Sequence, residues 1–99
     1  MADESNESST RIVVGPNDAV PAILSRLRAG RAASATITIP ASSSLFLTAS
    51  EFRALKATAE QARRILTVET DDRLRKQLAE MFGLPVVDHG DQIVHHDEL

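Results

Sequence analysis

The chain has 99 residues, 42% of them apolar and 25% charged, which indicates one small soluble domain with a single core. Its net charge of -3 and its lack of Trp and Tyr argue against base stacking and against general attraction to nucleic acid or acidic membranes. Because cysteine is absent, disulfides, thiolate catalysis and zinc–thiolate sites are excluded. The acidic N-terminus does not resemble a signal peptide, and no apolar run approaches the roughly 20 residues of a membrane span. We therefore expect a cytoplasmic protein.

The first thirty residues predict a polar lead-in, a strand and a helix. Residues 1–10 have no apolar residue after Ala2, so we expect them to be disordered. The β-branched run 11–14 predicts a strand that ends at Gly15. We expect Asn17 or Asp18 to cap a helix that stops at Gly30. Four apolar residues recur at helical spacing in that helix: Val20, Ile23, Leu24 and Leu27.

A second strand and helix follow, separated by a serine-rich loop. Residues 34–39 predict the strand, with Ile37 and Ile39 on one face and a small or polar face of Ala35, Thr36 and Thr38. The loop begins at Pro40. Thr48 and Glu51 form a capping-box pattern that predicts a helix start at Thr48. Its predicted apolar stripe is Phe52, Leu55, Ala59 and Ala62.

The last part of the domain repeats this pattern. Residues 64–70 predict a third strand, and Thr70 or Asp71 is expected to cap a third helix that ends at Gly83. Residues 84–87 predict a short fourth strand. The third helix is predicted to bury Leu74, Leu78, Met81 and Phe82.

Strands that alternate with helices of this length predict right-handed crossovers and a parallel sheet. We expect an α/β domain at residues 11–88, between the lead-in 1–10 and a polar tail or edge strand at 89–99. The predicted architecture is a small three-layer sandwich, flavodoxin-like or half-Rossmann, with a mostly parallel four-stranded sheet covered on both faces.

In such a sheet, ligands gather outside the carboxyl ends of the strands, near the point where the strand order reverses. The polar residues expected at this edge are candidate ligand-binding residues: Asn17, Asp18, Ser42, Ser43, Ser44, Thr70 and Asp71. The three serines could line an anion pocket. A simple connecting loop is the favoured interpretation, because the chain has no glycine-rich phosphate motif and no basic residue between Arg31 and Arg53.

Other chemical sites find less support in the sequence. Glu69, Asp71 and Asp72, together with Asp18, could bind magnesium, but helix capping is the favoured interpretation of these acids. A phospho-receiver site would need a lysine near the last strand, where this chain has none. A tail histidine group comprises His89, His95 and His96 and is interpreted as part of a solvated polar segment. No catalytic residue, metal site or cofactor is assigned.

A nucleic-acid interpretation remains as an alternative. Kink-turn RNA-binding domains are also small α/β sandwiches, and five basic residues could form a local patch: Arg63, Arg64, Arg73, Arg75 and Lys76. We expect these side chains on exposed helical faces, where they alternate with acidic residues. A solvated face of mixed charge is therefore favoured, without a nucleic-acid partner.

Residues 36–86 carry a family resemblance, in which a strand ends at Ile39-Pro40 and a small loop 42–44 leads into a helix containing Leu55-Lys56. A later strand ends at Thr70-Asp71, and the next helix closes on residues 83–86. This pattern resembles the N-terminal Rossmann-like domain of bacterial proteins often labelled baseplate-J-like. In that family the domain typically precedes a membrane segment and an extracellular part, so the resemblance implies either a cytoplasmic domain of a larger system or a free-standing version of that domain. It transfers no catalytic residues.

These observations predict a non-catalytic protein-interaction or assembly module that binds a partner chain or a second copy of itself. The alternative is a sensor that binds a small ligand, a nucleotide or an anion at the carboxyl edge of the sheet. A magnesium-dependent enzyme is the least supported hypothesis.

Overall fold

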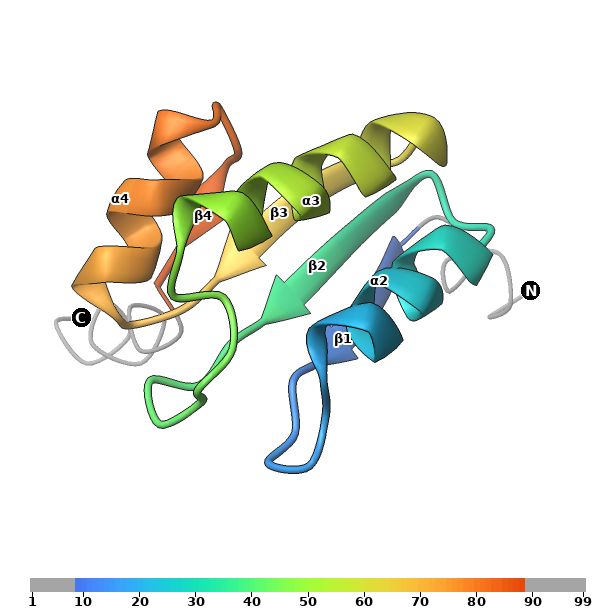
Figure 1. Cartoon of the computed structure of the whole chain (residues 1–99). Helices are drawn as coiled ribbons and strands as arrows, with labels where there is room; N and C mark the ends of the chain where they lie inside the picture. The colour runs from blue at the N-terminus through green and yellow to red at the C-terminus, as the bar shows by residue number, and fades with distance from the viewer. Residues whose placement is uncertain (1–8, 89–99) are drawn as a thin grey trace, which may run out of the picture.

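The computed structural model describes residues 9–88. Strands and helices alternate along the chain in the order β1 (Ser9–Val13), α2 (Val20–Ala29), β2 (Ser34–Thr38), α3 (Ala49–Gln61), β3 (Ile65–Glu69), α4 (Arg73–Met81) and β4 (Val86–Val87). All three strand pairs are parallel. The predicted α/β class and the four-stranded parallel sheet are confirmed (Figure 1).

The four strands lie side by side in chain order, β1-β2-β3-β4. Each crossover therefore leads the chain to the next strand position in the same direction. Because these crossovers are right-handed, all their helices fall on the same face of the sheet. Contacts of α3 with both α2 and α4 show that the helices form one layer (Figure 1). This sequential order is that of one half of a Rossmann fold. The second face of the sheet, which was expected to carry a third layer, is not covered by any described helix or strand.

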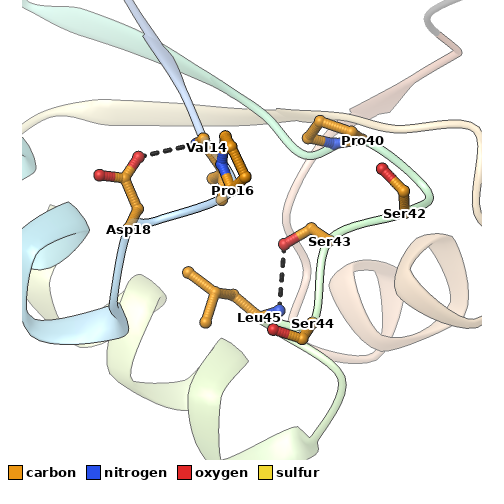
Figure 2. A pocket seen from close by; sticks show the side chains of 9 residues that line it. Val14, Pro16, Asp18, Pro40, Ser42, Ser43, Ser44 and Leu45 are labelled. Atoms are coloured by element: carbon orange, nitrogen blue, oxygen red, sulfur yellow. Dashed lines mark hydrogen bonds between the residues drawn. The ribbon is translucent and has the colours of Figure 1, made fainter.

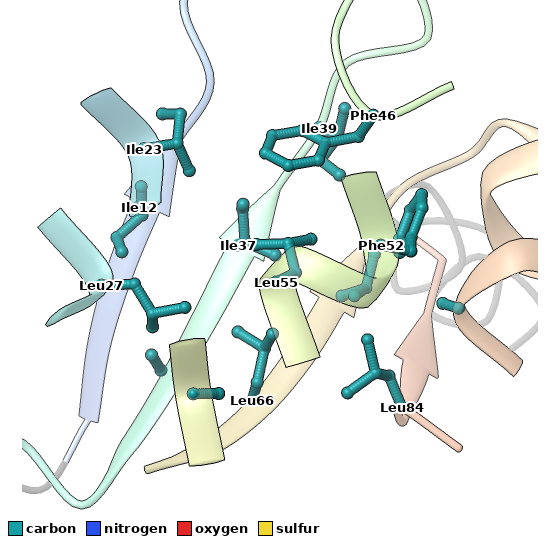
Figure 3. Close-up of a cluster of buried hydrophobic side chains, with 14 of the residues drawn as sticks. Ile12, Ile23, Leu27, Ile37, Ile39, Phe46, Phe52, Leu55, Leu66 and Leu84 are labelled. Carbon is teal, nitrogen blue, oxygen red and sulfur yellow. The ribbon is translucent and has the colours of Figure 1, made fainter. Parts of the chain in front are cut away.

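The core fills the space between the helices and the sheet (Figure 3). Alternate residues of the strands point into it, among them Ile12, Ile37 and Val68, each at most 5% exposed. The predicted stripes of the first two helices are confirmed at their central positions, where Ile23, Leu27, Phe52 and Leu55 are buried. Ala35 was wrongly assigned to the polar face of its strand. It is 1% exposed and belongs to the core.

The helix starts match the prediction in one case of three. Thr48 caps α3 as predicted, because its hydroxyl accepts a hydrogen bond from the Glu51 amide at 3.2 Å. The predicted caps of the other two helices are wrong. α2 begins after Ala19, without a side-chain cap, and α4 begins after Asp72, whose carboxylate accepts from the Arg75 amide at 3.0 Å.

The buried face of α4 is rotated relative to the predicted one. Leu74 is 46% exposed and Met81 is 69% exposed, so these two are not core residues. The buried side chains of the helix are those of Arg75, Leu78 and Ala79. An arginine thus occupies a position where the stripe of an amphipathic helix normally carries an apolar residue.

Candidate functional site

A cavity of about 290 Å³ lies at the carboxyl edge of the sheet, between the β1–α2 loop and the serine loop. Four of the predicted site residues line it: Asp18, Ser42, Ser43 and Ser44 (Figure 2). The rest of the wall is mainly apolar and is formed by Val14, Pro16, Pro40 and Leu45, with Gly15. The predicted gathering of the β1–α2 and β2–α3 loops is therefore present in the structure. Within residues 9–88, however, the sheet has no point at which the strand order reverses.

Asp18 closes the β1–α2 loop instead of capping the helix. One carboxylate oxygen accepts a hydrogen bond from the Gly15 amide at 2.7 Å. The other lies 3.3 Å from the Arg26 guanidinium, which reaches back from α2. Both oxygens of the Asp18 carboxylate therefore have a partner in the folded chain.

The serine loop is anchored in the core by Phe46. Its side chain is fully buried and meets Phe52 edge to face, with the ring centroids 6.1 Å apart. The Phe46 backbone adopts a φ of 60°, in the left-handed region that non-glycine residues avoid at a cost of about 1–2 kcal/mol. Burial of an aromatic side chain contributes about 1.5–3 kcal/mol, which offsets that cost. The loop thus follows a path that its phenylalanine stabilises.

Arg75 holds the same loop from the α4 side. Its guanidinium is fully buried and donates to the carbonyl of Leu45 at 2.9 Å, to that of Phe46 at 3.2 Å and to that of Ser43. Longer contacts reach Pro40 and Ala41. The prediction that Arg75 lies on an exposed helical face is wrong, and Arg75 cannot contribute to a basic surface patch.

The hydroxyls of the serine loop have different roles. The Ser43 hydroxyl accepts from the Leu45 amide at 3.0 Å, which tightens the turn. Ser42 and Ser44 are exposed residues that line the cavity. Three carbonyls of the loop are thus bound to Arg75 and one hydroxyl is used internally, while the exposed Ser42 and Ser44 offer two hydroxyls to the cavity.

The remaining predicted site residues lie elsewhere. Asn17 is exposed and does not line the cavity. Thr70 is buried, and its hydroxyl donates to the Ile39 carbonyl at 2.9 Å and accepts from the Asp72 amide at 3.2 Å. Asp71 lines a second hollow of about 350 Å³ on the other side of the strand ends, together with Val13, Thr38, Ile39, Pro40 and Ala41.

The open face of the sheet carries a polar cluster that the sequence did not indicate. We use the name open face for the strand residues that point away from the helices: Ser9, Arg11, Val13, Ser34, Thr36, Thr38, Ile65, Thr67, Glu69 and Val87. Arg11 reaches across two strands, donates to the Thr38 hydroxyl at 2.9 Å and forms an ion pair with Glu69. The Thr38 hydroxyl donates to the same carboxylate at 2.7 Å.

Apolar side chains flank this cluster on the open face. Val13 is 52% exposed, Ile65 is 67% exposed and Val87 is 44% exposed. Val13 and Val87 lie in the same row of the sheet as Thr38 and Glu69, one on each side, whereas Ile65 lies at the other end of β3.

Residues 9–88 contain no group of three His, Asp or Glu side chains placed to bind a metal ion. The acids considered for magnesium are separated, since Glu69 lies on the open face and Asp72 caps α4. None of the described helices has the length and apolar character needed to cross a membrane. The predicted histidine group of the tail lies outside the described residues.

Comparisons of the chain with protein-family models, with curated proteins and with solved structures gave no match.

Proposed function

We propose that this protein is a non-catalytic interaction or assembly module that uses the open face of its sheet, as a cytoplasmic domain of a larger system. The observation that carries the proposal is the single helical layer. Parallel sheets normally have both faces covered. Here Val13, Ile65 and Val87 stay exposed on the face that no described helix covers. The resemblance to the Rossmann-like domain of baseplate-J-like proteins supports the same role.

The size of the open face sets the kind of partner element that it fits. Three strands of five residues and one of two, spaced about 4.8 Å apart with about 3.3 Å per residue, form a surface of roughly 270 Å². A stable protein–protein interface buries about 800 Å² on each partner. One helix laid over the sheet, with further contacts beyond it, suits this area better than two open faces packed together.

The test compares two variants that carry the same substitution at similarly apolar, exposed positions. Ile65→Lys changes the open face, and Met81→Lys changes the outer side of α4, where the side chain is 69% exposed. Tagged wild-type chain and both variants are used to capture partners from the source cells, and the mass of each purified protein is measured by light scattering.

A partner or self-association that Ile65→Lys removes and Met81→Lys retains is the expected result. If all three proteins capture the same chains, the open face is not the interface. A monomeric wild type without any specific partner would contradict the proposed role itself.

A second candidate function is the binding of a small ligand in the carboxyl-edge cavity. Its lining favours a neutral ligand with hydroxyl or amide groups over an anion, because a carboxylate and two exposed hydroxyls face the cavity and no Lys or Arg side chain lines it. The test is an amide NMR titration with neutral polyols and nucleosides, and with phosphate for comparison. Shifts confined to the Asp18 and serine loops in response to a neutral compound would favour this function.

A further inference from the structure

Two turns meet at the amino edge of the sheet, opposite the cavity (Figure 1). The buried Arg64 joins them. Its guanidinium donates to the Leu27 carbonyl at 2.8 Å, at the end of α2, and to the Ala32 carbonyl at 2.7 Å, before β2. Residues on both sides of these contacts are therefore neighbours in space. Three exposed arginines belong to this region, and we call them the basic edge: Arg28, Arg31 and Arg63.

The basic edge has no acidic partner in the described part of the chain. The ion pairs found there are formed by other residues than Arg28, Arg31 and Arg63. Other exposed cations differ in this respect, since Arg26 pairs with Asp18 and Lys76 with Asp88. Three arginines at one edge repel each other, so an anionic partner lowers their electrostatic energy.

The backbone of Arg63 makes this position unusual. α3 ends in a Schellman motif, in which the Arg64 amide bonds back to the Ala59 carbonyl at 2.9 Å and Arg63 has a φ of 58°. α4 ends with the same hydrogen-bond pattern, but with Gly83 at the left-handed position. Glycine carries no steric penalty there, whereas the Cβ of an arginine is strained at this φ. The chain thus accepts a stability cost that holds a guanidinium at this edge.

The chemistry of the three side chains points to carboxylates. All are arginines, whose planar fork binds a carboxylate through two parallel hydrogen bonds. A nucleic acid fits the surface less well, because the chain has three aromatic residues, of which Phe46 and Phe52 are fully buried. We propose that the basic edge binds an acidic peptide segment of a partner protein. The basic edge adjoins the open face at Ser34 and Ile65 but shares no residue with it, and the two tests use different variants, so either proposal can fail without the other.

The test measures the binding of a Glu/Ser-rich peptide to the full-length chain by amide NMR, with a Gln/Ser peptide of the same length as the neutral control. Two exposed pairs of about 0.2–1 kcal/mol each correspond to a loss of about twofold to thirtyfold in affinity. We expect that loss in the variant Arg28→Gln/Arg31→Gln. The matched control Arg53→Gln/Arg73→Gln removes two exposed arginines elsewhere and is expected to change the affinity less than about twofold.

Arg63→Gly separates binding from structure. If Arg63 only ends α3, glycine at this position raises the unfolding midpoint and leaves the affinity for the acidic peptide unchanged. That result would overturn the proposed role of the Arg63 side chain in binding. We expect glycine to raise the midpoint and to weaken peptide binding about threefold, as loss of one exposed pair allows. Equal losses in both double variants would overturn the proposal, because they would reflect total charge alone. Tighter binding of a single-stranded RNA, or self-association that Arg28→Gln/Arg31→Gln removes, would also overturn it.

Discussion

Replacement of Arg75 by methionine removes the guanidinium donors that bind the serine loop from α4. Methionine still fills the same space with a long, unbranched side chain. Three carbonyls within 3.2 Å of the guanidinium then lose their partner, those of Ser43, Leu45 and Phe46. Each buried acceptor left unsatisfied costs about 1–3 kcal/mol. Part of that cost is recovered because the loop can turn its carbonyls toward water. We therefore expect the free energy of unfolding to fall by about 3–5 kcal/mol.

For a domain of this size, 1 kcal/mol corresponds to about 4–8 °C in the thermal midpoint, so the midpoint should fall by more than about 12 °C. Because the chain has no Trp, unfolding is best followed by far-UV circular dichroism, in urea and on heating. Arg73→Met is the control, since Arg73 is an exposed residue of the same helix. Arg75→Lys should be nearly as damaging as the methionine variant, because an ammonium cannot reach several carbonyls in a plane.

The opposite result would refute this account of the loop. If Arg75→Met stays within about 1 kcal/mol of the wild type, the carbonyl contacts are replaced easily and the loop does not depend on them. Removal of a buried charge would then have compensated the lost hydrogen bonds, as it does when buried ion pairs are replaced by apolar groups.

Three further predictions concern single backbone positions, and each is checked by urea unfolding. A Cβ at Gly30 would lie 2.1 Å from the Arg64 guanidinium. Gly30→Ala should therefore lower the free energy of unfolding by about 2 kcal/mol in the wild type, and by much less when Arg64 is replaced by methionine. Equal losses in the two backgrounds would show that the clash with Arg64 is not the cause. Thr48→Ala should cost about 1 kcal/mol through loss of the α3 cap, and Thr48→Ser should restore most of it. Gly83→Ala should lower the free energy of unfolding by about 1 kcal/mol because φ is +75° there, although no atom lies within 4 Å of the new Cβ. An unchanged unfolding midpoint would show that the backbone of this turn relaxes.

The order of the elements was predictable because β-branched runs and helical spacing alternate clearly along the chain. The caps were less predictable. Thr70, Asp71 and Asp72 all carry side chains that can cap a helix, and the choice depends on where the strand ends. Thr70 is used by the Ile39 carbonyl, so the cap falls to Asp72.

A signal for Arg75 was present in the sequence. Arg75, Leu78, Ala79 and Phe82 stand at the i, i+3, i+4 and i+7 spacing of one helical face, which predicts that the arginine lies on the buried side. The general preference of arginine for solvent led to the opposite expectation. Which carbonyls the guanidinium would meet depends on the path of a loop thirty residues earlier, and local pattern does not encode that contact.

A signal for the open face was also present in the strands, although we expected both faces of the sheet to be covered. Thr36, Thr38 and Thr67 alternate with Ile37 and Leu66, whereas strands buried on both faces are nearly continuous runs of apolar residues. Strand order could not be read in this way, because both a sequential and a reversed order satisfy the same alternation of elements. The cavity residues were predicted correctly as neighbours, since loops at the carboxyl ends of adjacent parallel strands meet in either order.

The sequential strand order has a consequence for how the chain acquires its structure. Each strand pairs with the strand that precedes it in the chain, and one helix joins the two. No strand has to be inserted later between two others, so each new βα unit can dock on an edge that is already formed. Loop closure then involves only one short segment at a time, which lowers the entropic cost of each step. During synthesis the sheet can therefore grow from β1 toward β4 in the order in which the strands leave the ribosome.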